Sequence, residues 1–233
     1  MPVFTQKAFT PRVILMMVIF VVGIPFLPLL ISLRWDWREA WAYVIIYILG
    51  FIASRALAAR RHPDLLAERA RYAQQEDAKA WDKYLSPMVG LGGGLIPLVA
   101  GLDMRFGWSP EFSPMLKILG LVLILVGYGL GTYALIENRF FSGMVRIQAE
   151  RGHRVVSSGP YRWMRHPGYA GALLAYLATP LFLDSAWAFV PAALISIIVF
   201  VRTSLEDRTL QEELDGYREY ANRIHYRLIP GIW

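Results

Sequence analysis

A polar segment between two apolar stretches carries the residue types best suited to bind a ligand. It covers residues 157–171 and reads SSGPYRWMRHPGYAG. The residue before a proline is pushed towards extended geometry, so we expect His166 outside regular helix, whereas Pro167 suits the first turn of the helix that follows. Free backbone N–H groups at a helix start attract a carboxylate or phosphate. The spacing equally supports an alternative, in which Arg162, Arg165 and His166 anchor the helix at lipid headgroups.

A second group of polar residues follows the last apolar stretch and begins with Arg202, Glu206 and Asp207. If the helix continues there, Glu206 shares a mostly apolar face with Leu210 and Tyr217. A carboxylate aimed inward at a membrane boundary needs a partner. That partner is either Arg202, one helical turn earlier, in an ordinary ion pair, or a bound cation or hydrogen-bonding ligand.

The sequence gives little support for a metal site or a nucleophilic residue. It has no cysteine, which excludes disulfides, thiolate ligands and a cysteine nucleophile. The four histidines form no two-histidine helical pair, and neither His-Glu-x-x-His nor Gly-x-Ser-x-Gly is present. We therefore predict no metal site.

Composition places the chain in a membrane. Hydrophobic residues make up 56% of the 233, and the mean hydropathy is +0.39, whereas soluble domains are about 45–50% apolar. The formal charge of +6 comes from cations spread over several short connections, so we attribute it to anionic lipid headgroups and predict no nucleic-acid binding.

A helix needs about 20 apolar residues to cross the hydrocarbon core. We therefore predict an all-α polytopic fold of about six transmembrane helices, with a cytoplasmic helical cap formed by the C-terminal tail. The fifth candidate is short and contains Pro180, so five spans plus a re-entrant helix is the alternative. Residues 1–136 would hold the first four helices and residues 137–233 the ligand-binding region. The six candidates are residues 13–33, 41–59, 85–102, 115–136, 169–183 and 187–205.

The distribution of cations predicts the orientation. With the N-terminus inside, 20 of the 24 Lys and Arg residues, Lys7 and Arg12 among them, fall on inner segments and 4 on outer connections. This bias puts both termini and residues 157–171 on the cytoplasmic side. Residues 13–33 are too long for a signal-peptide core, so we expect them to remain as the first membrane helix.

Glycines inside two of the candidate spans predict close helix packing. They form the run GLGGG at residues 90–94 and recur as Gly120, Gly127, Gly129 and Gly131. The run lacks the Lys-Ser/Thr of a phosphate-binding loop, so we interpret both sets as helix contacts.

The motifs of the C-terminal region resemble those of a known family. They are GPY at 159–161, RHPxYxG at 165–171, EDxxL at 206–210 and GYxxY at 216–220. In this order and spacing they resemble the isoprenylcysteine carboxyl methyltransferase family of integral membrane proteins. The earlier part of the chain resembles that family only in being helical and membrane-embedded.

The resemblance implies S-adenosylmethionine as the cofactor, bound at the cytoplasmic membrane face beneath the C-terminal segment. Carried over by position, the RHPxYxG motif supplies the cofactor contacts, the GPY motif shapes the loop before them, and the paired acids follow on the last helix. The second acid here is Asp, one methylene shorter. The implied cofactor residues are Gln148, His153, Val155, Gly159, Tyr161, His166, Pro167, Tyr169, Gly171, Glu206 and Asp207.

The residue types agree with such a cofactor. A sulfonium cation, an amino-acid end and an adenine together suit aromatic faces, carboxylates, a helix start and an apolar slot. A carboxylate acceptor, with a reference pKa of about 4, needs only orientation, for which Arg202 and Arg139 are candidates. An amine acceptor, with a reference pKa near 10, needs a base, for which Glu206 is the candidate. Isoprenoid acids and lipid amines are both compatible acceptors, and no oligomeric state is predicted.

Two other functions compete with a methyltransferase. The ending YRLIPGIW at residues 226–233, together with RHPxYxG, also resembles the C-terminal half of membrane sterol reductases, which use NADPH. That family usually has a longer chain and further nucleotide-binding residues, for which we find no clear counterpart. The other alternative is a membrane scaffold or transport factor without enzymatic activity. A membrane methyltransferase acting on a lipophilic substrate is the favoured hypothesis.

Overall fold

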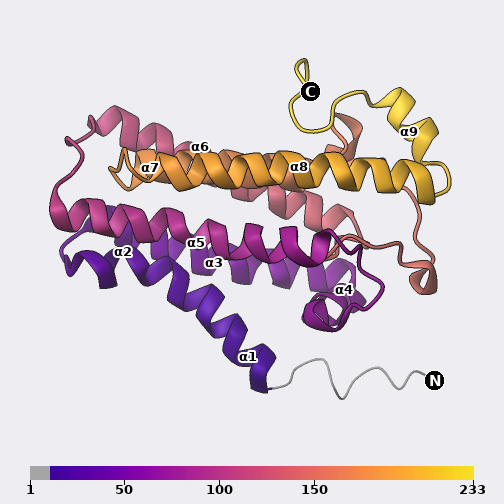
Figure 1. The fold of residues 1–233 in the computed structure, drawn as a ribbon, viewed down its shortest axis with the longest axis horizontal. Coiled ribbons are helices and arrows are strands. Elements are labelled where there is room, and N and C mark those ends of the chain that lie inside the picture. Colours follow the sequence, from indigo (N-terminus) through magenta and orange to yellow (C-terminus); the bar gives the residue numbers. More distant parts are fainter. Residues whose placement is uncertain (1–10) are drawn as a thin grey trace.

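The structure, a computed structural model, describes residues 11–233 and contains helices but no strand within that range. Lys7 lies outside the described residues. The helices are α1 (Pro11–Val18), a π-helical turn (Ile19–Gly23), α2 (Ile24–Ser32), α3 (Arg38–Arg61), α4 (Pro63–Ala70), α5 (Asp82–Phe106), α6 (Pro114–Glu137), α7 (Pro167–Phe182), α8 (Phe189–Glu213) and α9 (Tyr217–Arg223), with short 3-10 turns at Tyr72–Gln74, Ala149–Arg151 and Gly159–Arg162. The long helices run side by side, and the short helices α4 and α9 lie at the same end of the bundle (Figure 1).

Five helical stretches are long and apolar enough to cross a membrane, and they agree with five of the six predicted spans. They are Ile14–Ser32, Arg38–Arg61, Asp82–Phe106, Pro114–Glu137 and Phe189–Glu213. The sixth candidate is α7, which has 16 residues and a length of about 24 Å at helical rise. The all-helical polytopic fold with about six membrane helices is therefore confirmed.

Helix α7 runs along α6 from one end of the bundle towards the other. Near its start, a Cβ on Gly168 would lie 3.9 Å from the Cβ of Ala134. At its end, Asp184 forms a 2.9 Å ion pair with Lys117 in the first turn of α6. Pro180 leaves the helix continuous to Phe182. Its two ends therefore lie at opposite ends of the neighbouring helix, which favours a crossing over a re-entrant turn.

Glycines bring α6 and α7 into backbone contact. A Cβ added at Gly127 would lie 2.6 Å from the carbonyl oxygen of Gly171, and one added at Gly120 would lie 2.7 Å from the backbone nitrogen of Phe182. Small residues allow such an approach between membrane helices. Gly129 differs from the prediction, because a Cβ there would meet no described atom within 4 Å.

The glycine run of α5 also serves helix packing. A Cβ on Gly92 would meet Ile195 of α8 at 2.5 Å, and one on Gly93 would meet Tyr176 of α7 at 3.2 Å. Helix α5 thus packs closely against the two helices whose first and last turns carry the predicted site.

The C-terminal segment covers the end of the bundle where α7 begins (Figure 1). The backbone N–H groups of Arg165 and His166 donate to the carbonyl oxygens of Tyr226 and Arg227, both at 2.9 Å. The hydroxyl of Tyr220 in α9 donates to the carbonyl oxygen of Tyr161 at 2.7 Å. The tail is therefore attached to the loop that precedes α7 and forms the expected cap.

We predict that Gly127→Ala lowers the stability of the protein by about 1–3 kcal/mol, because overpacking forces the two backbones apart. Gly129→Ala is the matched control, since it adds the same methyl to the same helix without a close neighbour and removes a glycine from a helix interior. Thermal unfolding in detergent measures both. Equal melting temperatures for the two variants would contradict the close contact between α6 and α7.

Candidate functional site

A cavity of about 180 Å³ lies where the loop before α7, the end of α8 and α9 meet. Eight of the residues predicted from the sequence line it, and they come from three separate segments of the chain. They are Gln148, His153, Val155, Tyr161, His166, Tyr169, Arg202 and Glu206. The other five, Arg139, Gly159, Pro167, Gly171 and Asp207, do not line it.

Glu206 faces the cavity with a neutral hydrogen-bond donor at its side. The hydroxyl of Tyr169 donates to its Oε2 at 2.5 Å. The continuation of α8 to Glu213 carries Glu206 to this position, and the first turn of α7 carries Tyr169. The structure thus provides a carboxylate that borders an open space. The Tyr169 hydroxyl donates a hydrogen bond to it but supplies no positive charge.

Arg202 has a different partner from the one considered in the sequence. Its Nε and Nη2 donate to the two carboxylate oxygens of Asp82 at 2.7 and 2.9 Å, and Nη2 also donates to the carbonyl oxygen of Gly143 at 2.9 Å. Its guanidinium carbon lies 5.3 Å from the ring centroid of Tyr169. Its charge is therefore neutralised inside the protein, and its contact with the Tyr169 ring helps to fix that side chain.

Asp207 is fully buried and holds several donors together behind the cavity. Its carboxylate accepts from the Nε and Nη2 atoms of Arg165 at 2.7 and 2.8 Å, from Nε of Arg227 at 3.0 Å and from the Tyr217 hydroxyl at 3.1 Å. The Nε2 atom of His166 lies 3.2 Å from it. The family resemblance implied that Asp207 contacts the cofactor. In the structure Asp207 does not line the cavity, and its ion pairs connect α8 to the residue before α7 and to the C-terminal tail.

Three further motif residues shape the backbone around the cavity. Gly159 has a φ of +56° and a Cβ there would lie 2.9 Å from Glu137, so both conformation and space call for glycine. Pro167 occupies the first turn of α7 directly after His166, as predicted. Gly171 packs against α6. These residues position the lining side chains from outside the cavity.

His153 forms part of the cavity wall as a neutral side chain. Its ring lies 4.6 Å from that of Phe140, and its Nδ1 accepts from the backbone N–H of Gln148 at 3.3 Å. Burial, and then the charges of Arg146 and Arg151, lower the pKa of His153 to about 4. The Gln148 side chain donates to the carbonyl oxygen of Phe140 at 2.8 Å. This part of the wall is therefore held by internal contacts.

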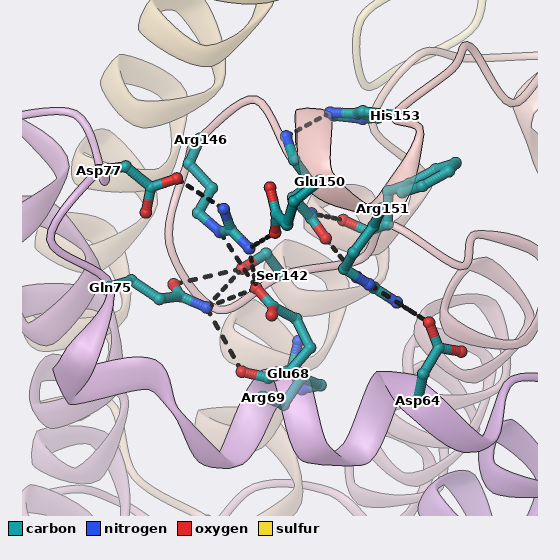
Figure 2. A network of polar contacts seen from close by, with 12 residues as sticks. Asp64, Glu68, Arg69, Gln75, Asp77, Ser142, Arg146, Glu150, Arg151 and His153 are labelled. Atoms are coloured by element: carbon teal, nitrogen blue, oxygen red, sulfur yellow. Dashed lines mark hydrogen bonds and ion pairs between the residues drawn. The ribbon is translucent and has the colours of Figure 1, made fainter. Parts of the chain in front are cut away.

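A charged network fastens the loop to α4 (Figure 2). Arg146, which lines the cavity, lies at its centre and contacts Glu68 at 2.9 Å and both Asp77 and Glu150 at 2.6 Å. Sequence reasoning missed Arg146, as it missed Asp82, because each owes its role to partners 60 or more positions away. Only the presence of a charge beside an apolar stretch hinted at them.

Arg139 belongs to the outer part of the same region. Its Nε donates to Asp64 at 3.0 Å, and Arg151 reaches the same carboxylate at 2.7 Å (Figure 2). The side chain of Arg139 is half exposed. The structure therefore places Arg139 in a surface ion pair outside the cavity.

The described residues contain no group of three or more His, Cys, Asp or Glu side chains that could hold a metal ion. The cavity is instead lined by aromatic rings, the carboxylate of Glu206, several hydrogen-bonding groups and five arginines.

We predict that His153 makes the protein less stable as the pH falls from about 6.5 to about 4. An unfolded histidine has a pKa of about 6.5, so in this window the unfolded chain binds a proton that the folded chain does not, and stability decreases. The loss of stability between pH 7.5 and pH 5 should be smaller in His153→Gln than in the wild type. His225→Gln, which changes an exposed histidine, should keep the wild-type dependence, and an identical pH profile for His153→Gln would contradict the prediction.

We also predict that Asp207→Asn destabilises the protein by about 3–5 kcal/mol, because it leaves buried cations without their counter-charge. The exposed Asp215 provides the matched control, and Asp215→Asn should change stability little. Chemical unfolding in detergent compares the two. Limited proteolysis of the C-terminal tail should accelerate only in Asp207→Asn, and an equally resistant tail would rule out the locking role.

Comparison with known proteins agrees with the motifs. Residues 119–212 match the model of the isoprenylcysteine carboxyl methyltransferase (ICMT) family. A probable protein-S-isoprenylcysteine O-methyltransferase of Oryza sativa subsp. indica is 30% identical over 110 residues, which cover 46% of this chain and 58% of that protein. Protein-S-isoprenylcysteine O-methyltransferase A of Arabidopsis thaliana is 31% identical over 132 residues, covering 55% and 63%. The chain thus spans less than two thirds of the length of these curated relatives.

The similarity in fold to a solved structure extends over more of the chain than the match to the family model. The structure of a eukaryotic intramembrane Ras methyltransferase, ICMT, superimposes with a TM-score of 0.51 and 20% identity, covering 96% of this chain and 88% of that chain. At this identity the likeness establishes a shared membrane fold. Residues 119–212, which contain the start of α7 and the acids of α8, match the model of the isoprenylcysteine carboxyl methyltransferase family, in agreement with the motifs.

Proposed function

We propose that this protein is an integral membrane methyltransferase that transfers a methyl group from S-adenosylmethionine to a lipophilic acceptor. The observation that carries this proposal is the cavity at one end of the bundle, where the family-matched segments bring Tyr169, His166 and Glu206 together. The curated relatives are named for O-methylation of protein-S-isoprenylcysteine. These names support the reaction type.

The lining of the cavity fits the parts of S-adenosylmethionine. The Glu206 carboxylate and the aromatic rings of Tyr161 and Tyr217 suit a sulfonium cation. Leu210 and Leu214 add apolar surface from the end of α8, which suits the adenine. At the start of α7, Gly168 and Tyr169 border the cavity, whereas the N–H groups of Arg165 and His166 are bonded to the C-terminal tail. The residues that would hold the cofactor are therefore those of the cavity wall and of the first turn of α7.

When bound, S-adenosylmethionine supplies an activated methyl group, whose bond to sulfur breaks with its electron pair left on sulfur as the bond to the acceptor forms. The protein's part is to align the donor and acceptor and to keep water out. Tyr169, fixed by Arg202 and bonded to Glu206, sets the orientation of that carboxylate. The C-terminal cap, attached at Arg165 and His166, closes this end of the bundle.

A second cavity supports a lipophilic acceptor. It measures about 340 Å³, lies among α3, α5, α6 and α7, and has largely apolar and aromatic walls that include Tyr43, Tyr128 and Tyr176. Phe141 and Gly168 border both cavities. An acceptor with a hydrocarbon tail can therefore occupy the membrane domain while its reactive end approaches the first cavity.

The distribution of charge supports a cytoplasmic position for the site. Helices α4 and α9 and the loop before α7 gather at the same end of the bundle (Figure 1). The inner segments, which hold 20 of the 24 Lys and Arg residues, include all three. Positively charged connections are characteristic of the cytoplasmic side.

We predict that the purified protein in detergent binds S-adenosylhomocysteine with micromolar-range affinity and that Glu206→Gln weakens this binding about tenfold or more, as expected for the loss of a charged hydrogen-bond partner. Tyr169→Phe should have a smaller effect in the same direction, because it leaves the charge in place. Titration calorimetry measures both, with Glu212→Gln, which changes an exposed acid on the same helix, as the control.

Two results would redirect the proposal. Saturable binding of NADPH, without binding of S-adenosylhomocysteine, would indicate a reductase. Binding of neither nucleotide would indicate a scaffold.

A further inference from the structure

Two arginines near the boundary of the two cavities form no ion pair with any carboxylate in residues 11–233. Arg55, near the end of α3, donates to the Ser54 hydroxyl at 3.4 Å, and its guanidinium carbon lies 4.6 Å from the Phe51 ring centroid. Arg69, in α4, donates to the carbonyl oxygen of Phe141 at 3.0 Å. Both side chains are partly buried. Two guanidinium groups inside the protein are therefore held by neutral contacts alone.

The acids near these arginines are already paired with other cations. Glu68, the residue before Arg69, lies 2.9 Å from Arg146, and Asp64 contacts Arg151 at 2.7 Å (Figure 2). The third arginine of this region, Arg202, has Asp82. Rearranging these pairs would leave another cation uncompensated, so Glu68, Asp64 and Asp82 do not supply a counter-charge to Arg55 or Arg69.

An uncompensated cation inside a protein is energetically unfavourable. Arg69 shows this cost: burial, and then the charges of Arg55 and Arg202, lower the pKa of its guanidinium group. The guanidinium group of Arg69 is thus near enough to those of Arg55 and Arg202 to be repelled by them. An anion placed among them would gain their attraction and relieve that repulsion.

The two arginines open to different cavities that meet at one side chain. Arg55 borders the membrane cavity, Arg69 borders the cavity of the proposed cofactor site, and Phe141 borders both. The guanidinium carbon of Arg69 lies 5.6 Å from the Phe141 ring centroid. That ring rests on α7 at Gly168, where an added Cβ would lie 2.6 Å from it. The positive charges therefore lie where an apolar space joins a polar one.

We propose that Arg55 and Arg69 form a binding site for the anionic head of an amphiphile whose hydrocarbon tail occupies the membrane cavity. The tail would contact the apolar and aromatic wall of that cavity, and burying it stabilises the complex by about 0.8 kcal/mol per methylene relative to water. The head would receive charge-assisted hydrogen bonds from the guanidinium groups.

The site also bears on the acceptor, a consequence that rests on the proposed function. A carboxylate held at the boundary of the cavities is ionised at neutral pH and needs orientation alone to react. A lipid amine is protonated at that pH, and two neighbouring guanidinium groups repel it. Of the two acceptor classes compatible with the sequence, Arg55 and Arg69 select the acid.

The experiment compares amphiphiles with matched 16-carbon tails: palmitate, hexadecyl phosphate, hexadecanol and hexadecylamine. Each is labelled and titrated into the full-length protein in uncharged detergent, without cofactor. We expect palmitate to bind at least tenfold more tightly than the alcohol or the amine. Tighter binding of hexadecyl phosphate than of palmitate would support the site and identify phosphate as its preferred head. Equal binding of palmitate and hexadecanol would overturn it.

Three variants test the residues. Arg55→Gln and Arg69→Gln should each weaken palmitate binding at least tenfold and leave hexadecanol binding unchanged, whereas Arg60→Gln, which changes an exposed arginine of α3, should leave both unchanged. Because each test variant removes an unpaired cation, its melting temperature should not fall below that of the wild type. Palmitate binding that survives in both test variants would refute the site.

Binding of S-adenosylhomocysteine, measured in the same samples, separates this inference from the proposed function. If the wild-type protein binds S-adenosylhomocysteine but binds palmitate no more tightly than hexadecanol, the anion site is contradicted and the methyltransferase is not. Palmitate discrimination without nucleotide binding would contradict the methyltransferase and leave the anion site in place.

Discussion

The convergence of cations on the buried carboxylate of Asp207 is the interaction on which the site depends. Arg165 precedes α7, Arg227 lies in the C-terminal tail, and Asp207 itself belongs to α8. Asp207 lies 42 positions from Arg165 and 20 positions from Arg227 in the sequence. Because the carboxylate is shared, the start of α7 and the cap are placed relative to the same helix. The adjacent residue, Glu206, then faces the cavity from a fixed backbone.

The arginines at this end of the bundle fall into two groups, those that have a carboxylate partner among the described residues and those that have none there. The first group has a structural role, and the second contains the arginines of the proposed anion site. Arg146, Arg165 and Arg202 each have carboxylate partners at short distance. Such pairs position the loop and helices, although a buried ion pair contributes little net stability after desolvation. Arg55 and Arg69 lack such partners within the described part of the chain. The paired group builds the wall of the site, and the unpaired group is available to a ligand.

Local chemistry made part of this site predictable from sequence. The restriction that proline places on the preceding residue located His166 and the start of α7, and helical periodicity directed Glu206 to a packed face. The same reasoning did not identify the partners of Arg202 and Arg139, because Asp82 and Asp64 lie in the first half of the chain. Short-range patterns give the direction of a side chain, but its partner is decided by which helices pack together.

The limited length of α7 has a further consequence for how a membrane-bound molecule reaches the cavity. Gly168 at its start is level with Ala134, about one helical turn before the end of α6. The start of α7, where Gly168 borders the cavity, is therefore recessed by about one turn relative to the end of α6. Under the proposed function, an acceptor dissolved in the adjoining leaflet enters sideways at this depth with its chain still solvated by lipid. Extraction into water, at about 0.8 kcal/mol for every methylene exposed, would then form no part of the reaction path.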